Sequence, residues 1–398
     1  MTERLYYTDS YLQAFDAQVV NVRDVGGRPG VVLDRTAFYP TSGGQPFDTG
    51  TLGDRRVVDV FDDDADIVHV IDGEAVAGAI TAHIDWPRRF EHMQQHTGQH
   101  VLSAAIDQVC GVRTESFHLG AASATIDLAR ELTLAEITDA EDLANAVVWE
   151  DRPVGIRFVD AEDSSALQLR KESARTGTLR IVDVEGFDVS ACGGTHVART
   201  GAIGIIAVSG WERLRGGTRL EFRCGVRALH RHRLLRDTVD AGSRLLSTAS
   251  EDLPQGIERL QQDGRDLRRR VKDLESRLAG FEADAVAAHA EDLHGFRVVA
   301  EAVPDADMNA IKTIAQSVAS RPGHVVVLLT AASPASVIVA RAPNVPVDCG
   351  RVLKQLIAHF GGKGGGRPEL AQGGGLLGRA DEIVAAARQL LSAALAGG

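Results

Sequence analysis

The chain has 398 residues, of which 44% are hydrophobic and 25% charged, a size and composition typical of a globular protein with two to four domains. Its net charge of −12 argues against a protein that coats nucleic acid indiscriminately, although a local basic patch could still bind one nucleic acid specifically. No apolar run is long enough for a membrane span, no secretion signal is found, and the four cysteines are scattered. We therefore expect a cytoplasmic protein with reduced thiols and no membrane partner.

Residues 1–85 are predicted to be rich in β-strands. Short β-branched or alternating runs at 18–23, 30–34, 56–61 and 67–71 are separated by Gly, Pro and Asp turns. The loop YPTSGGQP at 39–46 interrupts these runs, and its two glycines allow backbone conformations that are closed to other residues.

Residues 86–245 are predicted to mix helices and strands. The segments 90–109 and 134–150 have the pattern of helices, whereas 154–159, 178–184 and 203–209 have the pattern of strands. Two carboxylates in this region, Asp127 and Asp183, are interpreted as structural.

Residues 246–292 carry an apolar repeat. Seven side chains follow alternating steps of three and four residues, with Gly264 in the remaining position: Ile257, Leu260, Leu267, Val271, Leu274, Leu278 and Phe281. This spacing predicts a coiled coil or a helical hairpin, and it would allow a homodimer.

Residues 293–398 are predicted to form a small α/β domain. Strands are expected at 296–300, 325–330 and 337–340, and helices at 305–320, 349–360 and 381–395. This part holds ten Lys and Arg against seven Asp and Glu, while the whole chain is acidic. Its local balance therefore favours it as the nucleic-acid face.

Two short motifs carry the prediction of a metal site. His96 and His100 are four residues apart on a predicted helix and therefore share one face. Cys192 and His196 have the same offset around two glycines, which predict a turn that lets thiolate and imidazole converge. A surface histidine pair or a buried cysteine would explain either motif alone. Together they predict a tetrahedral His3Cys site that favours zinc, with one Zn2+ per chain.

The same residues limit the chemistry of that metal. A zinc protease of the H-E-x-x-H type needs a glutamate directly after the first histidine, and Thr97 stands there instead. Four protein ligands are typical of a closed structural site. The residues therefore leave open whether zinc would activate water or only orient its surroundings.

At these two motifs, HTGQH at 96–100 and CGGTH at 192–196, the chain resembles the editing domain of alanyl-tRNA synthetase and its free-standing relatives, the alanyl-tRNA editing proteins. Three longer segments are similar to the same family in the same order: FYP leading into GGQP at 38–46, ACGGTHVARTGAIG at 191–204, and GGKGGGRPE at 361–369. Each motif is modest alone, whereas the ordered set is specific.

The resemblance implies an α+β protein in four parts. These are an N-terminal β-barrel-like domain at 1–85, a zinc-binding editing domain at 86–245, a helical-hairpin or coiled-coil segment at 246–292, and a DHH-associated, tRNA-binding α/β domain at 293–398. It implies a trans-editing hydrolase that deacylates mischarged tRNA(Ala), above all Ser-tRNA(Ala) and then Gly-tRNA(Ala), without aminoacylation activity. The alternative is a zinc-stabilised tRNA-binding protein without catalysis. The chain has no Asp-His-His triplet, which argues against a DHH-type phosphodiesterase. A hydrolase of small esters would not need the basic C-terminal part, which argues against that class as well.

The resemblance also assigns site residues. The zinc ligands are His96, His100, Cys192 and His196. The candidate catalytic or pocket residues are Thr97, Gln99, Ser116 and His118, and Gln99 stands where many editing domains have threonine. The candidate tRNA contacts are Gly43, Gly44 and Gln45 in the first glycine-rich loop and Lys363, Gly365 and Arg367 in the second.

Overall fold

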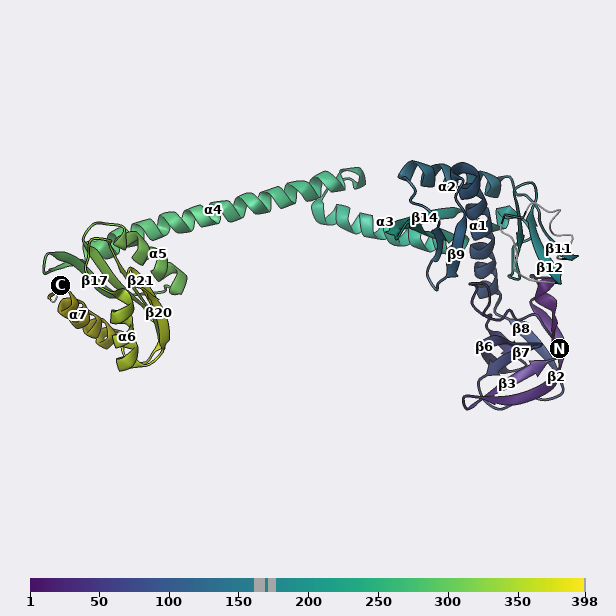
Figure 1. Cartoon of the computed structure of the whole chain (residues 1–398), viewed down its shortest axis with the longest axis horizontal. Helices are drawn as coiled ribbons and strands as arrows, with labels where there is room; N and C mark the ends of the chain where they lie inside the picture. The colour runs from purple at the N-terminus through teal and green to yellow at the C-terminus, as the bar shows by residue number, and fades with distance from the viewer. Residues whose placement is uncertain (161–168, 171–176, 397–398) are drawn as a thin grey trace. The chain divides into compact units, whose positions relative to one another are not determined.

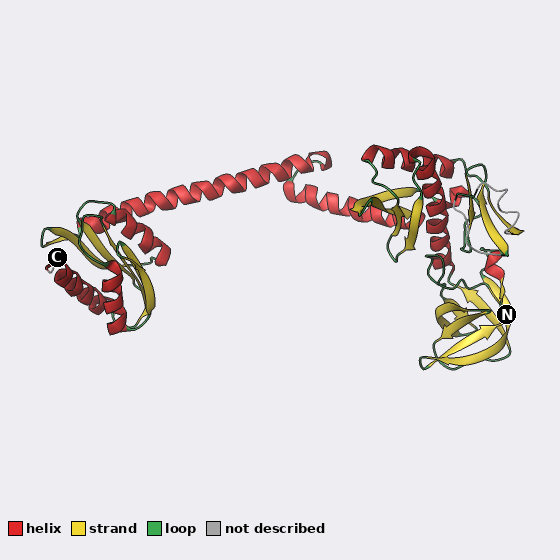
Figure 2. Ribbon diagram, in the orientation of Figure 1, coloured by secondary structure: helices red, strands yellow, loops and turns green. Residues whose placement is uncertain are grey.

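The computed structural model describes residues 1–160, 169–170 and 177–396 (Figure 1). Contacts divide the chain into two compact units, residues 1–242 and 243–398. Helices and strands are mixed in both units (Figure 2), which confirms the predicted α+β class. The finer division into four domains remains a prediction. Within the described residues, no helix is both long enough and apolar enough to cross a bilayer.

The first unit begins with a six-stranded barrel. Its strands are β2 (Ala14–Val25), β3 (Arg28–Leu33), β5 (Gly50–Leu52), β6 (Arg55–Asp63), β7 (Asp66–Ile71) and β8 (Ala79–Ile84), and they close in the order β2-β3-β7-β6-β5-β8. Two short strands, β1 (Glu3–Arg4) and β4 (Arg35–Thr36), pair in parallel beside a 3-10 turn at Leu5–Tyr7. Side chains such as Val31, Leu33 and Val57 fill the interior. The four predicted strand segments overlap β2, β3, β6 and β7, and only the last matches to within one residue, because β2, β3 and β6 extend further than predicted.

A buried ion pair ties the barrel to the helix that follows it, α1 (Trp86–Cys110). Arg89 and Asp48 are both fully buried, and Arg89 Nε donates to the two carboxylate oxygens at 3.1 and 3.0 Å. Asp48 also accepts from the backbone N–H of Tyr39 at 2.6 Å. Removing one partner of such a pair leaves an unpaired buried charge and costs about 3–5 kcal/mol. The first turn of α1 is thus held against the loop that contains the first glycine pair.

The rest of the first unit packs two sheets around α1. The other elements are β9 (Thr114–Leu119), β10 (Ala124–Leu128), α2 (Leu134–Trp149), β11 (Val154–Asp160), β12 (Thr178–Val184), β13 (Asp188–Ala191), a 3-10 turn at Thr200–Ile203, β14 (Ile206–Leu214), β15 (Gly217–Cys224) and α3 (Gly225–Leu246). The antiparallel sheets have the orders β14-β15-β10-β9 and β11-β12-β13. Helix α1 contacts strands of both, and Figure 1 shows it between them. The strand predicted at 203–209 begins later, at Ile206, because the 3-10 turn occupies its first position.

The second unit is a six-stranded sheet with helices on both faces. Its strands are β16 (Glu291–Leu293), β17 (Phe296–Val303), β18 (His324–Thr330), β19 (Ala335–Arg341), β20 (Lys363–Arg367) and β21 (Leu370–Leu376), in the order β16-β17-β18-β19-β21-β20. Its helices are α4 (Leu253–Ala288), α5 (Met308–Ala319), α6 (Cys349–Phe360) and α7 (Ala380–Ala396), after a 3-10 turn at Ser250–Asp252. Val325 and Val327 of β18 join the core under α6 and α7, and Val326 joins the core under α5 and the end of α4.

Two features of this unit depart from the sequence-based expectation. No strand is predicted in the glycine-rich segment, yet β20 forms there and pairs with β21 from Lys363↔Gly374 to Arg367↔Leu370. Cross-strand hydrogen bonds override the weak strand propensity of glycine. The apolar repeat lies on α4, which is a single uninterrupted helix and not a hairpin, and its seven side chains are 46–69% exposed.

Candidate metal centre

Four potential metal ligands converge in the first unit. His96 and His100 lie one turn apart on α1, whereas Cys192 and His196 come from the loop that follows β13. One donor atom from each residue lies within 4.8 Å of all the others. Cys192 Sγ is 3.4 Å from Nε2 of both His96 and His196. The fold therefore brings together all four residues of the two sequence motifs.

The donor set fits a zinc ion. A tetrahedral zinc with bonds of about 2.3 Å to sulfur and about 2.0 Å to nitrogen would separate those two atoms by about 3.5 Å. The observed sulfur–nitrogen separations are 3.4 Å. One thiolate and three imidazoles also form a soft donor set, which favours zinc over magnesium or calcium.

Each imidazole is oriented by a second contact through Nδ1. The three contacts are His96 to Gln45 Oε1 at 2.8 Å, His100 to Asp188 Oδ2 at 3.0 Å, and His196 to Thr97 Oγ1 at 3.1 Å. A histidine that donates its Nδ1 hydrogen keeps on Nε2 the lone pair that a metal requires. The second contacts therefore prepare the three rings as ligands.

Gln45 determines the tautomer of His96. Its Nε2 donates to Thr195 Oγ1 at 2.8 Å, while its Oε1 accepts from the backbone N–H of Thr195 at 3.2 Å. The atom facing His96 Nδ1 is thus the amide oxygen, which can only accept. Nδ1 of His96 must carry the hydrogen, so its Nε2 is free to bind a metal.

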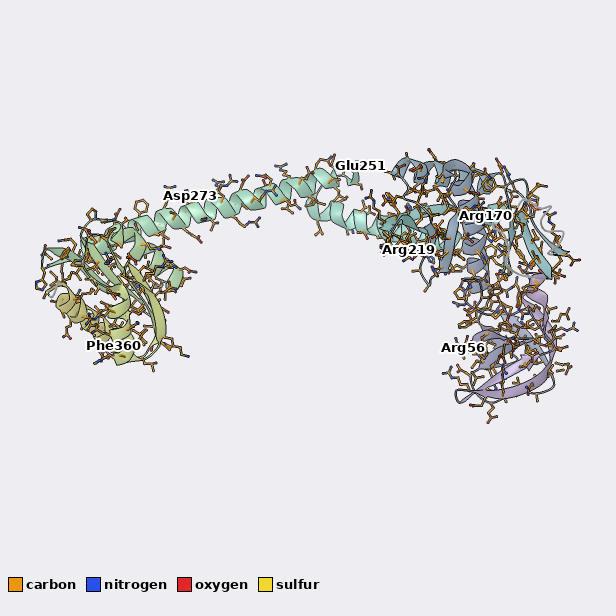
Figure 3. The ribbon with its side chains drawn as sticks, viewed as in Figure 1. Arg56, Arg170, Arg219, Glu251, Asp273 and Phe360 are labelled. Carbon is orange, nitrogen blue, oxygen red and sulfur yellow. The ribbon has the colours of Figure 1, made fainter. Side chains whose placement is uncertain are left out.

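Asp188 has a comparable role for His100. Arg170, labelled in Figure 3, donates through Nε to Asp188 Oδ1 at 2.7 Å, and Ser190 Oγ donates to Oδ2 at 3.0 Å. Burial alone would raise the pKa of Asp188, but the hydrogen bond from His100 and the charge of Arg170 lower it to about 2. The carboxylate is therefore ionised and accepts the Nδ1 hydrogen of His100.

The electrostatics of the cluster favours a thiolate. Burial alone would raise the pKa of the Cys192 thiol, but the imidazoles of His96, His196 and His100 hold it well below its usual range. Against the opposing effect of burial, Asp188 and Cys192 raise the pKa of His100 to about 9. Cys192 thus has the ionised sulfur that a zinc ion binds.

Packing requires the second glycine of the CGGTH motif. A Cβ on Gly194 would lie 2.1 Å from Cε1 and 2.4 Å from Nδ1 of His96. A Cβ on Gly193 would meet nothing closer than Tyr7 Oη at 3.7 Å, an ordinary contact. Gly194 therefore makes room for a ligand ring, whereas Gly193 does not.

A cleft of about 640 Å³ opens beside the cluster. Its wall includes the ligands His96, His100 and Cys192, the aromatic residues Tyr7, Phe117 and Phe158, and the cations Arg170 and Arg180. Arg180 donates to the backbone oxygens of Tyr7 at 2.9 Å and Cys192 at 2.6 Å. Its Nη2 is buried and has no hydrogen-bond partner among the described residues. The cleft thus combines a metal-ligand cluster with cationic and aromatic surfaces.

Two of the four predicted catalytic residues, Gln99 and Ser116, line this cleft. Gln99 Nε2 donates to Ser103 Oγ at 2.9 Å. Ser116 Oγ donates to Asp127 Oδ2 at 2.7 Å, and Arg219 binds the same carboxylate through bonds of 2.7 and 2.9 Å. Chiefly through Arg219, the pKa of Asp127 is lowered to about 2. Asp127 is therefore too weak a base to activate Ser116, which remains a hydrogen-bonding group.

The other two predicted catalytic residues do not reach the cleft. Thr97 is fully buried, and its Oγ1 contacts His196 and accepts from the backbone N–H of Val197 at 3.1 Å. It orients a ligand and cannot touch a substrate. His118 is exposed on β9 and is not part of the cleft wall. The geometry therefore gives no catalytic role to either residue.

The residues predicted to contact tRNA also differ in their exposure. Gly43 and Gly44 are exposed, and Gly43 lines the cleft. Gln45 is fully buried under the cluster and exposes no surface, whereas its contact with tRNA stays a prediction. In the second unit, Lys363, Gly365 and Arg367 are exposed on the edge strand β20.

Sequence reasoning missed the residues that orient the ligands. Gln45 and Asp188 lie 51 and 88 residues from the histidines that they contact. One pattern could have indicated Asp188, because Asp188 and Ser190 are alternate residues of β13 and share a face, and Cys192 directly follows the strand. Arg170 and Arg180 have no comparable sequence pattern.

Comparisons with known proteins match three separate segments of the chain. The chain matches the families described as tRNA synthetases class II (A) at residues 4–88, the threonyl and alanyl tRNA synthetase second additional domain at 179–221, and the DHHA1 domain at 295–393. Two of the three descriptions name tRNA synthetases, so the class is that of proteins with domains similar to those of tRNA synthetases.

Individual relatives narrow the assignment. The alanyl-tRNA editing protein AlaX-L of Pyrococcus horikoshii is 32% identical over 385 residues, with 94% of each chain covered. The alanine–tRNA ligase of Pyrococcus abyssi is also 32% identical, but the match covers 94% of this chain and only 42% of the ligase. Among solved structures, the C-Ala domain from Aquifex aeolicus alanyl-tRNA synthetase matches at 21% identity over 26% of this chain and 97% of that chain, with a TM-score of 0.25. The chain belongs to the family of alanyl-tRNA editing proteins. This membership confirms the predicted family and its class of editing hydrolases.

Proposed function

We propose that this protein is a trans-editing hydrolase that deacylates mischarged tRNA(Ala), with Ser-tRNA(Ala) as its main substrate and Gly-tRNA(Ala) as a second. The observation that carries the proposal is the position of the His3Cys cluster in the wall of a cleft of about 640 Å³. The name of the P. horikoshii relative, which matches nearly the whole chain, supports the same activity. In this reaction water adds to the carbonyl carbon, and the ester bond to the 3′-terminal ribose breaks.

The residues of the cleft fit such a substrate. A zinc ion held by the four ligands would supply a Lewis-acidic positive charge beside the cleft. Arg180 Nη2, which is buried and has no hydrogen-bond partner among the described residues, can donate to an oxygen of the substrate. Tyr7 and Phe158 offer aromatic surfaces on which a terminal base can stack. The ester is already activated, so orienting one water and stabilising the developing oxyanion would supply most of the acceleration.

We assign the discrimination against alanine to the polar groups of Gln99 and Ser116. Both line the cleft, and both can hydrogen-bond to a serine hydroxyl. Alanine would leave Gln99 and Ser116 without this additional hydrogen bond, which is a stronger basis for rejection than a difference in size. Glycine also lacks the hydroxyl, so we expect the protein to separate glycine from alanine less well than serine from alanine.

We assign contacts with the tRNA backbone to β20. Lys363, Gly365 and Arg367 are alternate residues of an exposed edge strand and therefore share one side. The double variant Lys363→Ala with Arg367→Ala should weaken tRNA binding several-fold and reduce the salt dependence of binding by about two charges. Lys272→Ala, which removes an exposed charge from α4, is the matched control and should leave both quantities unchanged. Equal effects of the two changes would refute the assignment.

The second candidate is a zinc-stabilised tRNA-binding protein without catalysis. It is favoured by one observation, namely that neither Thr97 nor His118 reaches the cleft. It predicts tight binding of tRNA and no loss of the ester.

Deacylation of Ser-tRNA(Ala), Gly-tRNA(Ala) and Ala-tRNA(Ala) distinguishes the two candidates. We expect rapid loss of serine, slower loss of glycine and sparing of alanine. Cys192→Ala should abolish both deacylation and zinc content, whereas Cys110→Ala, which alters a half-buried cysteine outside the cluster, should preserve both. A zinc-loaded protein that binds tRNA but hydrolyses none of the three esters would overturn the hydrolase in favour of the binding protein.

A further inference from the structure

A row of polar side chains crosses the four-stranded sheet whose edge strand β9 lines the cleft. Directly opposed positions of the sheet carry Ser116 on β9, Asp127 on β10, Arg219 on β15 and Glu212 on β14. Ser116 lines the cleft, whereas Glu212 lies on the opposite edge strand and is 66% exposed. Arg219, labelled in Figure 3, binds Asp127 through Nε at 2.7 Å and Nη2 at 2.9 Å, and its Nη1 is 3.9 Å from Glu212 Oε1. The row therefore connects the wall of the cleft with the far edge of the sheet.

The row fixes the direction of the hydrogen bond that Ser116 makes. Ser116 Oγ lies 2.7 Å from Asp127 Oδ2. Chiefly through the hydrogen bond from Arg219, the pKa of Asp127 is lowered to about 2, so its carboxylate is ionised at physiological pH and can only accept. Ser116 must therefore donate its single hydroxyl hydrogen to Asp127. The lone pairs of Ser116 Oγ remain, so this hydroxyl can only accept a hydrogen bond from a molecule in the cleft.

A second cross-strand ion pair of the unit shows what the row adds to ordinary sheet stabilisation. In the other sheet, Asp183 of β12 pairs with Arg157 of β11 at 3.0 Å, and neither residue lines the cleft. Opposite charges on neighbouring strands stabilise a sheet by their own attraction, and this pair does so without a hydroxyl. The row at Asp127 extends the same kind of pair to a residue of the cleft wall, and it thereby fixes what that residue offers to a ligand.

We infer that Asp127 positions the Ser116 hydroxyl so that the cleft selects a substrate with a hydrogen-bond donor at this point, which in Ser-tRNA(Ala) is the hydroxyl of the serine side chain. Asp127 is a positioning residue, because it acts through Ser116 and is not part of the cleft wall. A side chain of similar size to serine that lacks a donor should therefore be spared, as alanine is. The inference rests on the proposed function and adds to it the polarity of the group that is recognised.

Deacylation of tRNA(Ala) charged with serine, alanine or 3-fluoroalanine tests the polarity in the full-length protein. Fluorine is close to a hydroxyl group in size but carries no hydrogen that it could donate. After correction for uncatalysed hydrolysis, we expect the wild-type protein to hydrolyse the serine ester and to spare 3-fluoroalanine as it spares alanine. Equal hydrolysis of serine and 3-fluoroalanine, with alanine spared, would overturn the inference and leave the proposed function intact.

Asp127→Asn reverses the polarity while it preserves the shape of the side chain. Arg219 retains the amide oxygen, so the amide nitrogen donates to Ser116 and the hydroxyl hydrogen of Ser116 turns toward the cleft. The serine hydroxyl then loses its acceptor, so we expect its kcat/KM to fall about fivefold while kcat/KM for 3-fluoroalanine does not fall. Asp183→Asn is the matched control and should leave the kcat/KM of all three esters unchanged. Equal losses for all three esters in Asp127→Asn would assign Asp127 to the fold alone and overturn the inference.

A double-mutant cycle tests whether Asp127 acts through Ser116. Ser116→Ala should lower kcat/KM for serine about tenfold and leave kcat/KM for 3-fluoroalanine unchanged, because it removes the acceptor. When Asp127→Asn is added to Ser116→Ala, we expect no further change in the ratio of the two values, since there is no hydroxyl left to position. A further fall in this ratio, as large as in the wild-type background, would contradict a positioning role.

Binding of tRNA(Ala) analogues in which a stable amide replaces the ester separates the inference from the proposed hydrolysis. We expect the wild-type protein to bind the seryl analogue about tenfold more tightly than the 3-fluoroalanyl analogue, and Ser116→Ala to bind the two equally. This difference in a protein that hydrolyses no ester would support the inference and contradict the proposed hydrolase. Equal binding of the two analogues to the wild-type protein would overturn the inference.

Discussion

The barrel and the α+β domain both bury histidines, but the two regions use the ring nitrogens differently. In the barrel, His69 makes two internal contacts, from Nδ1 to the backbone oxygen of Val31 at 3.0 Å and from Nε2 to Thr36 Oγ1 at 2.8 Å. In the α+β domain, the cluster histidines use only Nδ1 for a supporting contact, and Nε2 of His96 and His196 faces Cys192. Burial alone therefore does not identify a histidine as a metal ligand. A ring nitrogen that faces the donor atoms of other potential ligands does identify one.

The charge states of the two regions differ accordingly. Burial lowers the pKa of His69 to about 4, so this ring is neutral at physiological pH. His100 is equally enclosed, yet Asp188 and Cys192 raise its pKa to about 9 against the effect of burial. The barrel therefore holds a neutral histidine that serves packing. The α+β domain holds His100 beside anionic groups, where a metal cation would take the place of the bound proton.

The largest effect should come from filling the space beside a ligand. Gly194→Ala forces a methyl group into the ring of His96, so we expect zinc affinity to fall by about 100-fold or more. Gly193→Ala adds the same methyl group one residue earlier, where space exists, and should retain zinc. Metal content after dialysis and competition with a chelator measure both. Equal retention by the two variants would show that His96 is not a ligand.

Lowering the pH should destabilise the barrel through protonation of His69. The pKa of His69 is about 4 in the folded chain and about 6.5 when unfolded, so between these values the unfolded state binds the additional proton. Stability is thus present above pH 6.5 and is lost as the pH falls toward 4. We expect a loss of about 2 kcal/mol between pH 7 and pH 5.

Hydrogen exchange of barrel peptides, corrected for the intrinsic exchange rate, measures this loss. His69→Gln keeps a polar side chain at this position but cannot titrate in this range, so its barrel should lose most of the pH dependence. An unchanged pH dependence in this variant would assign the effect to other groups.

The smallest effect should come from altering a supporting contact. Asp188→Asn keeps an acceptor for His100 but removes the negative charge that Arg170 binds, so we expect zinc to bind about tenfold more weakly. Asp183→Asn is the matched control, because Asp183 pairs with Arg157 at 3.0 Å away from the cluster. Competition with a chelator gives the zinc affinities of both variants. Equal affinities would show that Asp188 does not help to orient the metal ligands.

Local patterns predicted much of this molecule. The helix at 349–360 and the strand at 178–184 have the observed bounds, because their apolar periodicity is strong and their ends carry clear boundary residues. The four ligands were predictable because each pair lies within five residues. The glycine-rich strand β20 was not, because its pairing with β21 depends on tertiary hydrogen bonds and not on the propensity of its own residues.

The residues that orient the ligands could not be predicted from the sequence, because their contacts depend on the tertiary fold. Gln45 belongs to a loop whose glycines suggested contact with tRNA, and only the packing of that loop against α1 turned its amide toward His96. Thr97 was a candidate for substrate contact through the family resemblance, but both sheets cover α1 and bury this residue. Sequence spacing predicts which side chains share a face, whereas the neighbours of that face come from distant segments.

The distance along the chain between the two halves of the cluster has a consequence for biosynthesis. His96 and Cys192 are 96 residues apart, so at about 5–20 residues per second the ribosome needs roughly 5–20 s to add the second half after the first. During that interval α1 displays two imidazoles without a thiolate and without the carboxylate of Asp188. Loading of a metal would therefore be a late step in the maturation of each newly made chain, and a nascent chain that stalls before residue 192 would lack the sulfur needed to retain the ion.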